Sequence, residues 1–224
     1  MENTLLNEFE KYLKLKDEKI EDLDEFSPAV ALPLSFKVKS DVYLELDVRE
    51  DNSVEVTNTI LKNLNLNQNI SPLKFIFHEL IGNIYDHSLF KEAHVMGKSN
   101  QDYYEFGFMD DGITIPVSLK NNNFLFKNDC EAIIKAINGL STKNKTGYIE
   151  RGTGLNNTIN ITTNAFKGSV IIVSNGGLVY ITHESIISRD IPKNSISGTM
   201  ICLRMNVNKK IDIYKYLKQI KYDY

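Results

Sequence analysis

The spacing of apolar and polar residues along the chain predicts a mixture of amphipathic helices and short strands. Helical spacing of apolar residues occurs over 3–23, 54–66, 72–90, 130–138 and 154–166. Alternating or continuous apolar runs predict strands at 42–48, 103–109, 169–174, 178–182 and 201–207. Because Pro28 and Pro33 interrupt the pattern, we expect residues 29–36 to be extended, and 209–224 to form a terminal helix.

Asn175-Gly176-Gly177 separates two of these strands and is a strong hairpin signal, which makes the strands near the C-terminal end antiparallel neighbours. A purely parallel sheet is excluded on that basis. We expect an α/β fold of two layers, an open, mixed and largely antiparallel sheet with helices on one face. A loose boundary near residue 36 divides it into an N-terminal helical extension, 1–36, and a main domain, 37–224.

Length and composition narrow the classes of function. The chain has 224 residues, 42% hydrophobic and 25% charged, which is enough for one sizeable core. Its net charge of −3 argues against nucleic acid and against an anionic membrane surface as partners. Cys130 and Cys202 lack the spacing of a zinc site or a disulfide framework. With an acidic N-terminus and no apolar run of about 20 residues, we expect a cytoplasmic protein.

The helix at 72–90 carries the first candidate chemistry. Glu79, Asn83 and Asp86 share one stripe, while the opposite side is apolar. A solvated helix surface has the same pattern. The alternative is a Mg²⁺-nucleotide site, because Mg²⁺ keeps several waters and takes only one or two oxygen ligands from protein. In that site Asn83 would bind the metal and Glu79 would orient or deprotonate water.

Three further motifs follow in the sequence, and each has an ordinary structural explanation. Asp110-Asp111-Gly112 at the end of an apolar strand is a turn signal. Gly152-Thr153-Gly154 before a helix offers backbone amides to phosphate, yet two glycines in a loop are common. Gly198-Thr199 before the last strand is weaker still. None of them decides a function alone.

Together, in this order and spacing, the motifs resemble those of the Bergerat-fold (GHKL) ATPases, the superfamily of gyrase, heat-shock chaperone, histidine kinase and mismatch-repair ATPases. The resemblance covers roughly residues 40–207. Its boxes E-x-x-x-N, D-x-G-x-G, G-x-G-L-G and G-T are matched in turn, with His87 as the histidine often added four residues after the asparagine. The matching residues are Glu79, Asn83, Asp110, Gly112, Thr114, Gly152, Gly154, Leu155, Asn156, Gly198 and Thr199. Thr114 and Asn156 stand where the family has glycine, so we expect an altered phosphate geometry or lid motion.

The resemblance implies Mg-ATP as the ligand. Asp110 would accept a hydrogen bond from the adenine amino group, with Thr199 completing the base site through water. Asn83 would hold Mg²⁺, and Glu79 would act as general base. The amides of Gly152, Thr153, Gly154, Leu155 and Asn156 would bind phosphates. Residues 113–151 would form a lid whose Lys143 and Arg151 either reach the terminal phosphates or are solvated charges.

In layout the chain resembles stand-alone anti-sigma-type serine/threonine kinases. We expect a regulatory ATPase or protein kinase that acts with a protein partner. The alternative is an ATP-gated protein-binding switch without turnover. No histidine precedes His78, which argues against an autophosphorylating sensor kinase. The first helix, 3–23, is either a helix that caps the main domain or a surface for a partner or a homodimer.

Overall fold

A central antiparallel sheet organises the fold. The computed structural model describes residues 4–18, 27–35, 43–64, 69–99, 102–140, 153–206, 210–217 and 222. The described strands are β1 Tyr43–Glu45, β2 Ala93–Ser99, β3 Tyr103–Asp110, β4 Ser169–Ser174, β5 Gly177–Ile181, β6 Ile186–Asp190 and β7 Thr199–Asn206. They form one open sheet in the order β1-β2-β3-β7-β4-β5-β6, and all neighbouring pairs are antiparallel. The expected α/β class and open sheet are confirmed, but the sheet is not mixed.

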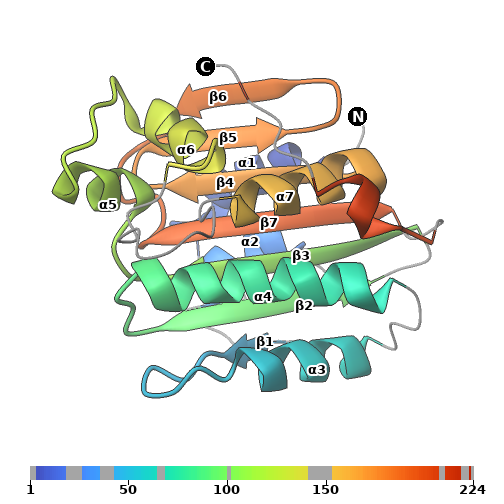
Figure 1. Cartoon of the computed structure of the whole chain (residues 1–224). Coiled ribbons are helices and arrows are strands. Elements are labelled where there is room, and N and C mark those ends of the chain that lie inside the picture. Colours follow the sequence, from blue (N-terminus) through green and yellow to red (C-terminus); the bar gives the residue numbers. More distant parts are fainter. Residues whose placement is uncertain are drawn as a thin grey trace.

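The larger core lies between this sheet and a layer of helices (Figure 1). The helices are α3 Ser53–Asn63, α4 Ile70–His87, α5 Ile115–Asn121, α6 Asp129–Ile137 and α7 Gly154–Asn160, the last running directly into the π-helical turn η1 Ile161–Ala165. Phe77 of α4 packs edge-on against Phe106 of β3, with ring centroids 4.6 Å apart. Among the described helices none is long and apolar enough to cross a membrane.

A second core covers the opposite face of the sheet, so the expectation of helices on one face is wrong. Helices α1 Leu5–Leu15 and α2 Pro28–Ser35 pack behind the strands (Figure 1). The α2 segment was expected to be extended. It is helical and buried over Ala29–Leu32, so it shows no polar face by which a helix is recognised in sequence. Helix α1 ends at Leu15 rather than near residue 23, and its apolar face is buried within the chain.

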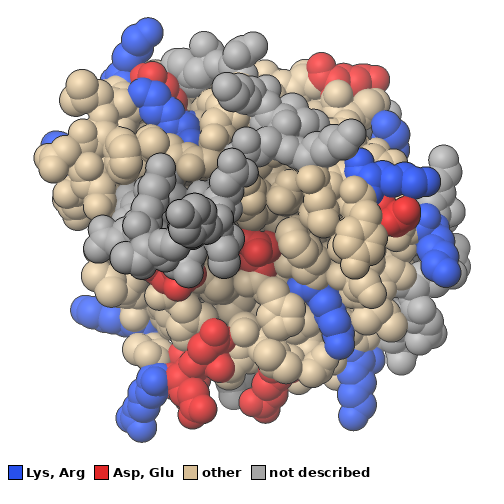
Figure 2. Space-filling model, in the orientation of Figure 1, with Lys and Arg blue, Asp and Glu red and all other residues tan. Residues whose placement is uncertain are grey.

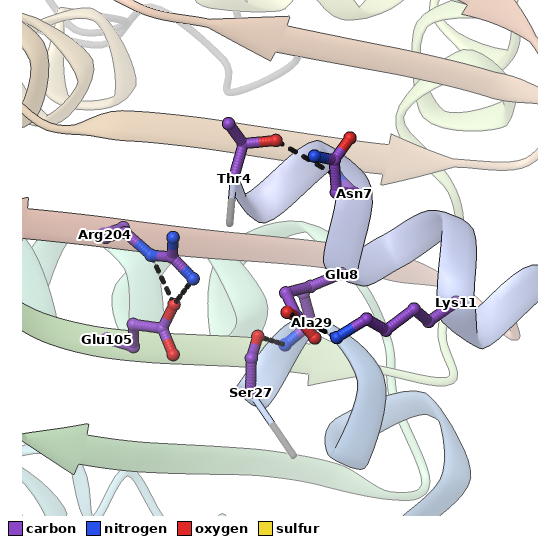
Figure 3. A network of polar contacts seen from close by, with 8 residues as sticks. All are labelled: Thr4, Asn7, Glu8, Lys11, Ser27, Ala29, Glu105 and Arg204. Atoms are coloured by element: carbon purple, nitrogen blue, oxygen red, sulfur yellow. Dashed lines mark hydrogen bonds and ion pairs between the residues drawn. The ribbon is translucent and has the colours of Figure 1, made fainter. Parts of the chain in front are cut away.

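A charged pair lies under these N-terminal helices. Glu105 of β3 and Arg204 of β7 are register partners, and the arginine donates to the carboxylate (Figure 3). Burial raises the pKa of Glu105, and the Arg204 guanidinium opposes that rise. Nearby, the buried carboxylate of Glu8 pairs with Lys11 at 2.9 Å. The carboxylates of Glu105 and Glu8 are buried beside the second core, where a paired ion is favoured over a single one.

Three asparagine side chains hold the C-terminal segment against the helical layer. Ile211 donates its N–H to Asn69 at 2.8 Å, and Asn160 of α7 donates to the carbonyl of Tyr216. Asn138, which caps α6, exchanges two hydrogen bonds with the backbone of Tyr222, at 2.7 and 2.8 Å. The terminal helix predicted for 209–224 is therefore wrong over the described residues, whose only helical element is the 3-10 turn η2 Ile213–Lys215.

Candidate functional site

A row of polar side chains crosses three strands at the end of the sheet beside α5 (Figure 1). Asp110 of β3 pairs in register with Thr199 of β7, and Thr199 pairs with Ser174 of β4. Directly paired residues of antiparallel strands point to the same face. That face is the larger core, since Phe108, Ile201 and other apolar residues two positions along belong to it. The row is thus a polar edge of an apolar core.

Asp110 is the buried carboxyl group of this row, with 3% of its surface exposed. Its Oδ1 accepts the N–H of Gly112 at 2.9 Å. Burial raises the pKa of Asp110 to about 7, while the hydrogen bonds from Gly112 and Ser88 oppose the rise and the nearby Asp111 adds to it. A carboxyl group in this setting is a strong hydrogen-bond acceptor that a buried ligand donor could satisfy.

Two close backbone contacts fix the loops around Asp110. A Cβ on Gly112 would lie 2.1 Å from the carbonyl oxygen of Ser88, the residue that caps α4. Gly198 has φ +62° and lies against the carbonyl of Asp110, where a Cβ would come within 2.1 Å. Only glycine fits these two positions. They bring the end of α4, the loop after β3 and the Gly198-Thr199 turn together.

The polar stripe of α4 faces α7 in part. Three residues of the stripe are half-buried, namely Glu79, Asn83 and His87, whereas Asp86 is exposed to solvent. Burial lowers the pKa of His87. Glu79 lies against the start of α7, because a Cβ on Gly154 would come within 1.6 Å of its Oε2. Helices α4 and α7 lie side by side in front of the sheet (Figure 1).

The two positions that depart from the family pattern have structural roles of their own. Thr114 is the N-cap of α5, and its hydroxyl accepts the N–H of Val117 at 3.4 Å. Asn156 is buried within the first turn of α7, where its backbone is helical and needs no glycine. Leu155 is half-buried and packs against the larger core, and Thr153 precedes the helix as its N-cap residue. These residues therefore form the start of α5, which contacts the row, and the start of α7, which contacts Glu79 of α4.

The predicted lid, 113–151, is described only in part. Lys143, Arg151 and Gly152 lie outside the described residues. Helix α6, predicted at 130–138, is confirmed, and its apolar face, including Cys130 and Ile133, belongs to the larger core. Asp129 at its start accepts hydrogen bonds from Asn175 at 2.9 Å and Gly176 at 3.0 Å. Hydrogen bonds thus hold α6 against the β4-β5 hairpin. The lid over residues 113–151 stays a prediction.

Acidic side chains lie near the middle of the described surface around the site (Figure 2). Figure 2 shows the face that carries α4 and α7, with acidic side chains near the middle and several Lys and Arg side chains around its edge. Among the described residues there is no cluster of three or more His, Cys, Asp or Glu that could hold a metal ion alone. A polyphosphate on this face would need a cation between it and the protein.

Sequence reasoning missed two residues of this site. Ser174 closes the polar row, and its hydroxyl lies 2.8 Å from that of Thr199. Ser88 supports the Asp110 loop through its carbonyl, which accepts the N–H of Ile113 at 2.5 Å. Ser174 ends an apolar run just before the hairpin signal. A polar residue at the end of a buried strand was the one feature of the sequence that could have indicated a site residue. Its pairing with Thr199 required the strand order.

No protein-family model matches the chain, and no curated protein is significantly similar to it. Function is therefore inferred from the residues and geometry of this chain.

Proposed function

We propose that the chain binds Mg-ATP between α4, α7 and the polar row, in the manner of the Bergerat-fold ATPases. The observation that carries this proposal is the convergence of four motifs separated by up to 120 residues, from Glu79 to Thr199. Glu79 lies against Gly154, Gly112 against Ser88, and Gly198 against Asp110. Asp110 and Thr199 are side by side in the sheet. Helix α4 joins the two groups of contacts, because Glu79 lies on it and Ser88 caps it.

The chemistry of the converging groups fits an adenine nucleotide. Asp110 offers a buried acceptor for an exocyclic amino group, beside the hydroxyl of Thr199. On α4 the half-buried amide of Asn83 is a suitable single protein ligand for Mg²⁺, whose other ligands would be phosphate oxygens and water. The acidic middle of this face makes a metal-neutralised polyphosphate a better ligand than a free anion (Figure 2).

On this basis we propose a regulatory ATPase or protein serine/threonine kinase that acts with a protein partner. Glu79 would deprotonate a water or a protein hydroxyl. Mg²⁺ held at Asn83 would offset charge on the transferred phosphoryl group. The apolar face of α1 is buried against the sheet, so a partner or a second copy would use another surface.

One contact favours the second candidate, an ATP-gated binding switch. The Glu79 carboxylate lies at the first residue of α7, the place where phosphates would approach the helix amides. A nucleotide phosphate entering there would repel this carboxylate and displace it. Binding would then change the contact between α4 and α7, which a partner protein could sense without turnover.

Titration of Mg-ATP by calorimetry tests the ligand. Wild type should bind, Asp110→Ala should lose at least about tenfold in affinity, and Asp86→Ala, on the exposed side of α4, should bind like wild type. Equal affinity of wild type and Asp110→Ala would refute the base site. Removing Mg²⁺ with EDTA should weaken ATP binding.

Phosphate release under saturating Mg-ATP separates the enzyme from the switch. Glu79→Gln keeps the size of the side chain and removes its charge. For an enzyme it should abolish turnover while ATP affinity holds or rises, because a competing anion is removed. For a switch, wild type should show no turnover with or without a partner, yet ATP should change the hydrogen exchange of α7.

A further inference from the structure

Ser174 holds a central place in the polar row although it is completely buried, with 0% of its surface exposed. Its Oγ accepts the N–H of Ile115 at 2.9 Å and lies 2.8 Å from Oγ1 of Thr199. Ile115 is the first residue of α5, so this N–H is one of the helix-start donors that need a partner outside the helix. Ser174 therefore connects the start of α5 to Thr199 in the polar row.

The direction of the hydrogen bond between the two hydroxyls follows from their surroundings. A hydroxyl has one proton to donate and two sites that accept. If Thr199 donated to Ser174, the Ser174 oxygen would accept from both Ile115 and Thr199. The proton of Ser174 would then have no acceptor among the described residues. A buried donor left without a partner is costly. Half-buried Thr199 can instead donate toward solvent or a ligand, so Ser174 donates to Thr199.

This order makes the row directional. The N–H of Ile115 donates to Ser174, Ser174 donates to Thr199, and the proton of Thr199 is left to point into the site. Beside it, Asp110 is an acceptor when ionised. The site thus presents an acceptor next to a donor. The Watson–Crick edge of adenine, an amino donor next to a ring-nitrogen acceptor, is complementary to it, whereas guanine has the reverse order.

We propose that Ser174 is a positioning residue that sets the Thr199 hydroxyl as a donor and so makes the site select adenine over guanine nucleotides. This inference rests on the proposed nucleotide function. It assigns base selection to a buried serine that would not touch the ligand. It also ties the start of α5 to the base site.

The test compares full-length wild type, Ser174→Ala and Ser174→Thr. Calorimetric titration with Mg-ATP and Mg-GTP gives the ratio of the two affinities. Wild type should prefer ATP. Ser174→Ala removes the donor that fixes the orientation of the Thr199 hydroxyl and should reduce the ATP-to-GTP affinity ratio by about tenfold or more. Ser174→Thr retains the hydroxyl and should restore the ratio. A purely structural serine would weaken both nucleotides equally.

Hydrogen exchange gives a second measurement that needs no ligand. The amide of Ile115 should exchange faster in Ser174→Ala than in wild type, while Ser174→Thr should keep it protected. An unchanged ATP-to-GTP ratio in Ser174→Ala, with wild type binding ATP, overturns the inference alone. Failure of wild type to bind ATP overturns both the inference and the proposed function. Unchanged Ile115 exchange in Ser174→Ala overturns the hydrogen-bond order.

Discussion

The carboxylate of Glu79 occupies the space beside Cα of Gly154, where a methyl group would lie 1.6 Å from Oε2. Residues 75 positions apart in sequence are therefore in direct contact. The contact joins α4 to α7. Glycine is needed at position 154 because Glu79 occupies the space of a side chain there, and not because a turn requires it.

Gly154→Ala should displace Glu79, because the end of a glutamate side chain moves more easily than backbone. The free energy of unfolding should change by less than about 1 kcal/mol, since alanine also favours the helix. In a Glu79→Ala background the same substitution should be more favourable by about 0.5–1 kcal/mol. Chemical denaturation of the four proteins in this cycle measures the coupling, and additive effects would contradict the contact.

Gly112→Ala should be far more harmful. Its Cβ would lie 2.1 Å from the carbonyl oxygen of Ser88, and backbone cannot turn aside as a side chain does. We expect a loss of about 2–3 kcal/mol in unfolding free energy. Gly82 is the matched control, because a Cβ there meets nothing within 4 Å and the residue lies inside α4. Gly82→Ala should stabilise the protein by about 0.5–1 kcal/mol in the same denaturation assay.

The stability of the protein should depend on the ionisation of Asp110. Its pKa rises from 3.8 to about 7 on folding, so the folded state binds more protons between these values. The free energy of unfolding therefore falls as pH rises from about 4 to about 7, and the full cost remains above that range. Asp110→Asn should remove this pH dependence, so that its stability relative to wild type is about 4 kcal/mol higher at pH 8 than at pH 4.

Thermal unfolding of wild type and Asp110→Asn across this pH range checks the prediction. The exposed Asp86→Asn on α4 is the control and should leave the wild-type profile nearly unchanged. A parallel pair of profiles for wild type and Asp110→Asn would show that the Asp110 carboxyl is not perturbed.

Removing one member of the Glu105–Arg204 pair should cost more than removing both. Arg204→Met leaves the carboxylate, which is 1% exposed, without its partner and should cost about 3–5 kcal/mol. The double substitution Glu105→Leu with Arg204→Met should recover much of this loss. Denaturant midpoints of the single and double variants are the measurement, and a double variant as unstable as the sum of the single ones would contradict it.

Periodicity and turn chemistry predicted the elements on which the site depends. The helix at 72–90 is α4, and the strand at 103–109 is β3. The hairpin at Asn175-Gly176 is confirmed, with Asn175 at φ 56° and Ser174 opposite Gly177. These signals are local, because each side chain pattern or positive φ is set by neighbours in sequence.

The elements that were missed depend on distant contacts. Strand β2 has a glycine, Gly97, at a position where Leu64 and Phe106 leave little room for a side chain. Because this position lacks an apolar residue, the sequence of β2 does not have the pattern of a buried strand. Helix α2 has apolar residues on all sides because both the sheet and α1 cover it. Such a run has no helical period to detect. The C-terminal segment is held by asparagine side chains from three other regions, which no local pattern reports.

The same limit applies to the candidate site. Asp110 and Gly112 stood out because an acidic turn follows an apolar strand. Ser174 did not, since its role follows from the order β3-β7-β4. Conversely, Asp86 lies on the same stripe of α4 but is exposed, because a helix stripe can extend beyond the part that neighbouring elements cover.

The position of β7 has a consequence for synthesis of the chain. This strand lies in the middle of the sheet, between β3 and β4, yet it is the last of the described strands in sequence. Without residues 199–206, the other described strands could pair only as β1-β2-β3 and β4-β5-β6, and β3 and β4 would each have an unpaired edge. Unpaired edges attract other strands and promote aggregation. We therefore expect the chain to be most prone to aggregation during synthesis before β7 emerges.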